Sequence, residues 1–257
     1  MSLTKLIVRF AAPVPKLESF QRYLFLGPHP DDIEIGAGAT AAKLVSQGKD
    51  LCFVVCTDGR YGLGNAPAGS TPETLIPLRQ EEARRSAAML GVTDLRFLPY
   101  SDGALYKQDD LLRSLASIIG DFQPDVILAP DPDVTSECHR DHRNVGEAAR
   151  QLACFAPFPE LMEAYGAKSA PVKALAYFMT AKANQYVKTT GFFRRQLDAV
   201  FLCHTSQFPP SCPEGKAIRL YLKLRAADFG LRCLCSSAEG FRVLGQTHMH
   251  VLPEAGN

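Results

Sequence analysis

The stretch YLFLGPHPDDIE, residues 23–34, decides the fold prediction. Its first five residues form a short apolar run that ends at Gly27, as expected for a buried strand of a parallel sheet. An imidazole and three carboxyl groups follow between His29 and Glu34. Ligands of parallel sheets bind at the carboxyl ends of the strands. The stretch therefore predicts a buried strand with a functional site directly after it.

Three more apolar runs of this kind occur in the first half of the chain, with helical periods between them. Alternating strands and helices are typical of a parallel sheet that is covered on both faces. We predict an α/β fold, a Rossmann-like three-layer sandwich with a mostly parallel central sheet. The doubly wound strand order three, two, one, four would make the first and fourth strands neighbours. The further runs are residues 51–56, 95–98 and 126–129, and the helices are residues 78–90 and a segment that begins with Asp109 and Asp110.

The second half of the chain is less regular but shows no linker. We expect a strand around residues 175–179, a helix that contains Phe193 and Leu197, and a further helix after Pro213. We therefore predict a single domain over residues 1–257, in which 1–152 form the core and 153–257 continue it. The segment 57–76 is rich in glycine and is predicted to be a long loop that is functional or mobile.

Composition excludes several classes of partner. Lys and Arg number 28 and Asp and Glu 27, so a net charge of +1 gives no basic footprint for nucleic acid or a membrane surface. No apolar stretch reaches the ~18 residues of a membrane span. The apolar residues 6–8 are interrupted by Arg9, so we expect no signal peptide. Eight cysteines without a C-x-x-C spacing favour reduced thiols and a cytoplasmic protein.

A second polar cluster, HRDH at residues 139–142, lies after the fourth predicted strand and before a helix. If strands one and four are adjacent, this cluster and residues 29–34 face one crevice. Together they offer imidazoles and carboxylates, the donors that a catalytic zinc prefers, with one position left open for water. Taken singly, each of these residues could be a helix cap or a solvated loop residue. Their joint position favours a metal site.

The segment GAGATA, residues 36–41, fits a loose dinucleotide-binding pattern, and Asp58 lies about 20 residues downstream. In a nucleotide-binding turn, however, the glycines directly follow the strand, whereas residues 28–35 intervene here. Close packing of a helix start on the sheet explains Gly36 and Gly38 equally well. A nicotinamide-dependent oxidoreductase is therefore an alternative, and a non-catalytic sugar-binding protein is another.

The two clusters resemble the motifs of the zinc-dependent PIG-L/LmbE-like de-N-acetylase family. The motifs are HPDDxE at residues 29–34 and HxDH at residues 139–142, and the resemblance covers nearly the whole chain. Within the family, the archaeal diacetylchitobiose deacetylases look most similar. That similarity to the archaeal branch rests on APDP at 129–132 and THMH at 247–250. The resemblance to the family as a whole is supported by TDG at 57–59, RxxE at 79–82, HTSQ at 204–207 and AEGF at 238–241.

The resemblance implies an LmbE-like fold and a hydrolase that removes the acetyl group from an N-acetylamino sugar such as N-acetylglucosamine or diacetylchitobiose. His29, Asp32 and His142 would hold one Zn²⁺ per subunit. Asp31 would be the general base that activates the attacking water. A thiol-precursor glycoside or an antibiotic glycoside is the alternative substrate.

The resemblance also implies roles for residues around the metal. His139 would stabilise the oxyanion, and Asp141 would hold its ring in place. Arg79 and Asp102 would contact hydroxyl groups of the substrate.

Family members of the similar branch are homo-oligomers, so a hexamer or a trimer is expected. His250, or failing that His248, would then reach the pocket of a neighbouring subunit. Arg140 departs from the family pattern, which usually has proline there, and we expect its side chain to lie along the rim of the site in water.

Overall fold

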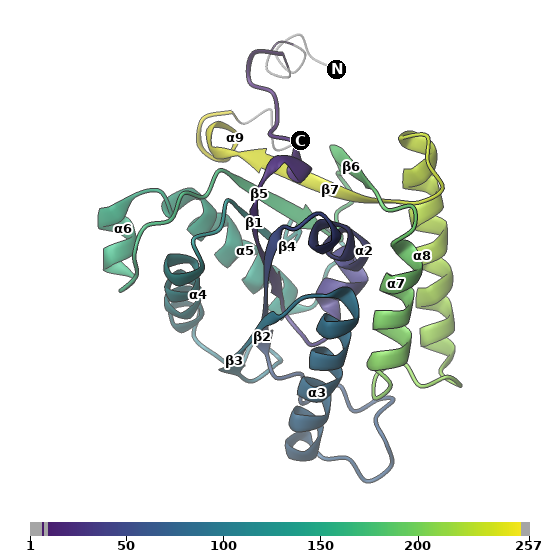
Figure 1. Ribbon diagram of the computed structural model, residues 1–257. Coiled ribbons are helices and arrows are strands. Elements are labelled where there is room, and N and C mark those ends of the chain that lie inside the picture. The colour runs from purple at the N-terminus through teal and green to yellow at the C-terminus, as the bar shows by residue number, and fades with distance from the viewer. Residues whose placement is uncertain (1–6, 8–9, 253–257) are drawn as a thin grey trace.

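Seven strands form one sheet in the computed structural model, in the order β3-β2-β1-β4-β5-β7-β6 (Figure 1). The structure describes residue 7 and residues 10–252, so most of the segment in which we looked for a signal peptide lies outside it. The first five strands are parallel, and β7 runs antiparallel to both β5 and β6. The mostly parallel α/β sheet is thus confirmed. The strands are β1 Arg22–Gly27, β2 Asp50–Thr57, β3 Asp94–Tyr100, β4 Val126–Pro130, β5 Ala174–Phe178, β6 Gln185–Lys188 and β7 Ala238–Gly245.

The predicted order three, two, one, four is also confirmed. Tyr23 of β1 pairs with Leu51 of β2 on one side and with Val126 of β4 on the other. The loops that follow β1 and β4 therefore leave the sheet side by side. These loops carry the two polar clusters of the sequence.

Helices cover both faces of the sheet (Figure 1). The helices α4, α5 and α6 lie on one side, and α2, α3, α7 and α8 lie on the other. The three-layer arrangement is the predicted one. The helices are α2 Asp32–Ser46, α3 Pro72–Leu90, α4 Gln108–Phe122, α5 Arg140–Phe155, α6 Pro159–Ala164, α7 Phe193–Asp198, α8 Pro213–Arg232 and α9 Gln246–His250, with a 3₁₀ turn at Leu17–Ser19 and a π-helical turn at Ala199–Cys203.

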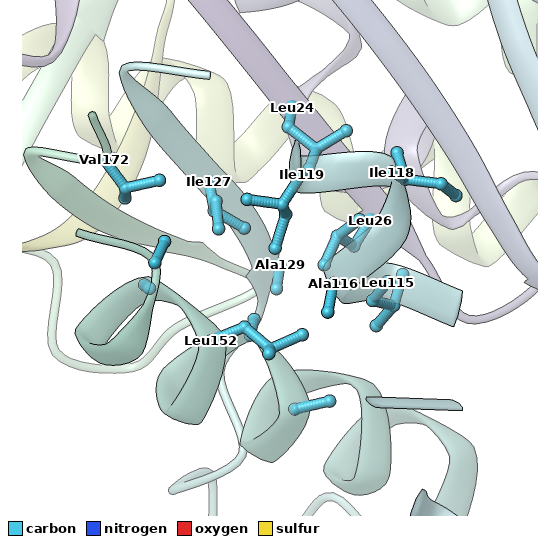
Figure 2. Close-up of a cluster of buried hydrophobic side chains, with 14 of the residues drawn as sticks. Leu24, Leu26, Leu115, Ala116, Ile118, Ile119, Ile127, Ala129, Leu152 and Val172 are labelled. Atoms are coloured by element: carbon cyan, nitrogen blue, oxygen red, sulfur yellow. The ribbon is translucent and has the colours of Figure 1, made fainter. Parts of the chain in front are cut away.

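Alternation along β1 supplies both halves of the core. Leu24 and Leu26 point to the face covered by α4 and α5, where they join Leu115, Ile119 and Leu152 (Figure 2). The side chains between them, such as that of Phe25, point to the other face, because successive side chains of a strand point to opposite faces of the sheet. Each fully buried side chain of this size contributes roughly 1.5–3 kcal/mol to folding.

Helix α3 begins earlier than we predicted. It starts at Pro72 rather than after Pro77, which lies inside the helix, so the glycine-rich loop ends at Thr71. The Thr71 side chain accepts a hydrogen bond from the Thr74 amide, and the Thr74 side chain bonds back to the Thr71 amide. This capping box, with Pro72 in the first turn, is a stronger start signal than Pro77.

Helix α2 is kinked at Ala37, whose φ of −151° is not helical. Beyond the kink, a new first turn exposes the amides of Ala39 and Thr40, and both donate to the buried carboxyl group of Glu239 from β7. Glu239 thus acts as an N-cap from a distant strand.

Gly36, which precedes the kink, packs so closely on Phe178 that a Cβ would lie 2.2 Å from the ring. The segment 36–41 is therefore part of a helix packed on the sheet and forms no nucleotide-binding turn.

No helix within the described residues is both long and apolar enough to cross a membrane. All eight cysteines carry free thiols, and four of them are buried.

We predict that Glu239→Gln changes how stability depends on pH. Burial raises the pKa of Glu239 from 4.5 to about 7. The folded state therefore keeps a proton that the unfolded state releases between these values, and this group's contribution to stability is lost as the pH rises from about 4.5 through about 7. Glutamine does not titrate. The advantage of wild type over Glu239→Gln in urea-unfolding free energy should be larger at pH 5 than at pH 8, by more than ~1 kcal/mol.

The exposed Glu147→Gln on α5 serves as the control and should show no such pH effect. A difference between wild type and Glu239→Gln that stays constant from pH 5 to pH 8 would contradict the prediction.

Candidate metal centre

The loop after β1 places His29, Asp31 and Asp32 at the carboxyl edge of the sheet. The Asp32 carboxylate accepts a hydrogen bond from the His29 amide at 2.8 Å, and the same oxygen lies 3.1 Å from His29 Nδ1. Asp31 has a φ of 137°, a region that residues other than glycine rarely adopt. Strain of this kind costs about 1–3 kcal/mol and concentrates at functional sites.

The loop after β4 delivers the second cluster to the same place. His139 caps helix α5, since its Nδ1 accepts the Asp141 amide at 3.3 Å. His142 lies in the first turn, and its Nε2 is 3.3 Å from Asp32 Oδ2. The imidazole rings of His29 and His142 are 5.3 Å apart. Residues more than 100 positions apart in the sequence thus share one site, as the predicted strand order requires.

Three donors in this site can hold a metal ion. Atoms of His29, Asp32 and His142 all lie within 4.8 Å of one another. His29, His139 and Asp141 form a second such group, but Asp141 is fully buried and its oxygens already accept the amides of Gly103 and Ala104 at 2.7 and 2.9 Å. The first group has fewer of these competing bonds. Two imidazoles and one carboxylate suit Zn²⁺.

The charge around His29 also favours a cation. Burial alone would lower the pKa of His29, but its contacts with Asp141 and Asp32 raise it to about 10. The field that holds a proton on this ring is supplied by carboxylates, and the same field attracts a divalent ion. A bound metal would replace that proton.

Asp141 lies between two imidazoles. Its Oδ2 is 3.2 Å from His29 Nε2 and 3.7 Å from His139 Nδ1. The shorter contact is with the candidate ligand His29, whose Nδ1 is left facing Asp32. That Asp141 keeps the His139 ring in place stays a prediction. The structure shows that His29 lies nearer to Asp141 than His139 does.

Arg79 contacts the strained Asp31 from helix α3. Its Nη2 lies 3.1 Å from Asp31 Oδ2 and also donates to the Pro30 carbonyl, while Nη1 donates to the Gly59 carbonyl. Only 4% of Arg79 is exposed. Burial and the charge of the adjacent Asp32 raise the pKa of Asp31 to about 6, against the lowering effect of Arg79. Arg79 therefore fixes the Asp31 loop from behind.

The buried Asp102 is bonded to the glycine-rich loop, because its Oδ2 accepts the Tyr61 amide at 3.2 Å. The expected contacts of Arg79 and Asp102 with substrate hydroxyls remain predictions, since both side chains already have partners within the chain. Arg140, the first residue of α5, is exposed, as we expected of a rim residue.

The C-terminal histidines lie at the opposite edge of the sheet. Helix α9 follows the end of β7, where Gly245 pairs with Ala174, the first residue of β5. His248 bonds to the Gly245 amide and to the Ala12 carbonyl, whereas His250 is exposed. His250 therefore cannot serve the metal centre of its own chain.

Sequence reasoning missed the residues that support the site. Glu82 of α3 accepts three hydrogen bonds from Thr205 and Ser206, and Glu34 of α2 lies 3.3 Å from His204 Nε2. The quoted motifs at 79–82 and 204–207 contain most of these groups, but their pairing needs the tertiary structure.

Glu137 was also missed. Its Oε1 accepts the His139 amide at 2.8 Å, and its Oε2 lies 3.2 Å from Nδ1 of the candidate ligand His142. Carboxylates in this position orient metal-binding imidazoles. A carboxylate five residues before a candidate ligand is the one signal that the sequence offers.

Known proteins match this chain. The PIG-L family, described as GlcNAc-PI de-N-acetylase, matches residues 24–153. Diacetylchitobiose deacetylase of Thermococcus kodakarensis is 30% identical over 238 residues, which cover 91% of this chain and 87% of that protein. A probable N-acetyl-alpha-D-glucosaminyl L-malate deacetylase 2 of Bacillus anthracis is 28% identical over 145 residues, covering 55% and 63%.

Among solved structures, N,N'-diacetylchitobiose deacetylase from Pyrococcus horikoshii, complexed with an inhibitor, superimposes with a TM-score of 0.87 at 27% identity. The match covers 98% of this chain and 97% of that one.

We predict that Glu137→Gln weakens metal binding without unfolding the protein. The amide removes the negative charge beside His142 Nδ1, so the ring should be a poorer and less well oriented ligand. Affinity for Zn²⁺, measured by calorimetric titration, should fall roughly tenfold or more. Glu147→Gln on the exposed side of α5, the helix that carries His142, is the control. Equal affinities for the two variants would refute the role of Glu137.

Proposed function

This chain belongs to the PIG-L family of de-N-acetylases, and we propose that His29, Asp32 and His142 hold its catalytic Zn²⁺. It is a hydrolase that removes the acetyl group from an N-acetylamino sugar, giving acetate and the free amine. The proposal rests on one observation: these three metal-binding side chains lie close together, and the buried carboxyl group of Asp31 lies beside them. When bound, the ion would lower the pKa of a water molecule and polarise the amide carbonyl.

Asp31 is proposed as the general base. Asp31 immediately precedes Asp32 in the sequence, yet its own carboxylate faces Arg79 instead of His29 or His142. It is thus free to accept the proton of the attacking water and to deliver it to the departing amine. The positive φ of Asp31 and the three hydrogen bonds of Arg79 fix the carboxylate in this position.

His139 is proposed to donate a hydrogen bond to the oxyanion. Because its Nδ1 accepts the Asp141 amide, the proton of a neutral ring lies on Nε2. Burial and the neighbouring His29 lower the pKa of His139, which favours this neutral form. A neutral N–H can stabilise charge that develops on the carbonyl oxygen. Asp141 would keep both His139 and His29 in their orientations.

We propose N-acetylglucosamine or diacetylchitobiose as the substrate type. Support comes from the relative that matches nearly the whole chain, a diacetylchitobiose deacetylase, and from the solved structure with the TM-score of 0.87. Another N-acetylglucosaminide is the second candidate, favoured by the shorter match to a probable glucosaminyl malate deacetylase.

We further propose a homo-oligomer, a hexamer or a trimer, that works in the cytoplasm. His250 can contact substrate only in a neighbouring subunit, because α9 lies at the edge of the sheet away from its own metal centre. Eight free thiols agree with a reducing compartment.

Acetate release tests the proposed reaction. The Zn²⁺-loaded protein should release acetate from N-acetylglucosamine or from diacetylchitobiose, and Asp31→Asn should lower kcat by at least ~100-fold, because the amide cannot accept the proton. Asp31→Asn should still bind Zn²⁺. Wild-type rates in Asp31→Asn would refute Asp31 as the base.

Metal analysis tests the ligand assignment. His29→Ala and His142→Ala should each lose bound Zn²⁺ together with activity, whereas His139→Ala should keep the metal and lose turnover. Zinc content after dialysis, measured by mass spectrometry, distinguishes the two groups. Stoichiometric zinc in His142→Ala would overturn the proposed ligand set.

A further inference from the structure

Helix α8 has two apolar sides, and the protein covers only one of them. Leu222, Ala226 and Phe229 are buried on the inner side. On the outer side Leu220 is 58% exposed, and Leu224 is 62% exposed. Figure 1 shows α8 at the margin of the molecule, with no other element beyond it. We call the outer side the outer stripe, and it consists of Ala217, Leu220, Leu224, Ala227 and Leu231.

The spacing of the outer stripe is that of a coiled coil. Its members follow one another at intervals of three, four, three and four residues, which are the a and d positions of a heptad. The inward Leu222 and Phe229, seven residues apart, occupy the opposite f positions. Leu231, in the last turn of α8, is 77% exposed. Monomeric proteins rarely expose an apolar stripe of this length, and such patches mark interaction sites.

The charges beside the stripe identify the partner. In a parallel coiled coil, a g residue of one helix faces the e residue of the next heptad in the other. Lys223 is at a g position, and Asp228, which also pairs with Arg232 of its own helix at 2.8 Å, is at the following e position. Two identical α8 helices side by side would therefore place Lys223 of each copy against Asp228 of the other. This complementarity is built into one sequence, so the fitting partner is a second copy of this chain.

We propose that the outer stripe is a two-fold interface in which the α8 helices of two copies pack in parallel. The bodies of the two chains lie on opposite sides of the helix pair, because the f positions of each α8 are buried against its own chain. The helix is already folded in each chain, so pairing buries the leucines without the cost of forming a new helix. The interface does not depend on the proposed reaction.

Light scattering after size-exclusion chromatography tests the interface. Wild type should have twice the monomer mass of 28.1 kDa or an even multiple of it, and Leu224→Glu or Leu231→Glu should halve that mass. The matched control is Leu161→Glu on α6, another exposed leucine on a helix, which should leave the mass unchanged. Circular dichroism should show the same helix content in all variants.

A wild-type mass of 28.1 kDa, or of three chains, would overturn the two-fold interface and leave the stripe for a different partner. An unchanged mass in both glutamate variants would overturn it as well.

Charge reversal tests the parallel arrangement. Lys223→Glu and Asp228→Lys should each weaken the dimer, because they place like charges opposite one another. The double variant restores opposite charges between copies, so it should regain dimer relative to both single variants. A double variant that is no better than the single ones would refute the parallel pairing.

Discussion

The carboxylate of Asp141 joins two loops and the start of a helix at one point inside the protein. It contacts His29 Nε2 from the loop after β1 and accepts the amides of Gly103 and Ala104 from the loop after β3, and it belongs itself to the first turn of α5. A fully buried carboxylate without these partners would cost several kcal/mol. The loops therefore have to come together for the chain to fold. The metal centre is assembled by the same contacts, since they fix the ring of His29 beside Asp32 and His142.

A second group of buried bonds supports the proposed base. Arg79 holds the Asp31 loop, and one helical turn further along α3 Glu82 holds Ser206. Gln207 in turn donates to the Gly62 carbonyl of the glycine-rich loop. The chain thus surrounds the metal centre with segments whose positions depend on each other. Such mutual support allows Asp31 to keep a strained backbone, because the surrounding bonds compensate for the strain.

The sheet could be predicted because its signals are local. Apolar runs of strand length, each followed by a turn residue, depend only on neighbouring residues, and the rule for doubly wound sheets then fixes which strands adjoin. The sequence analysis missed a feature whose deciding contact is distant, and it misplaced the start of one helix. The kink in α2 needs Glu239, about 200 residues away, to bind the freed amides. The start of α3 depends on a capping box of two threonines with Pro72 in the first turn, a stronger start signal than the Pro77 on which the prediction relied.

The sequence by itself determined the class of the fold, the two polar clusters and the edge of the sheet at which they meet, because these follow from periodicity and strand order. The tertiary structure decided which partner each side chain of the candidate metal centre contacts. It turned Nε2 of His29 toward Asp141, placed Glu137 beside His142, and buried Arg79 behind Asp31. It also left one side of α8 uncovered. These outcomes depend on side-chain directions and on contacts between distant segments, which no local pattern of residues specifies.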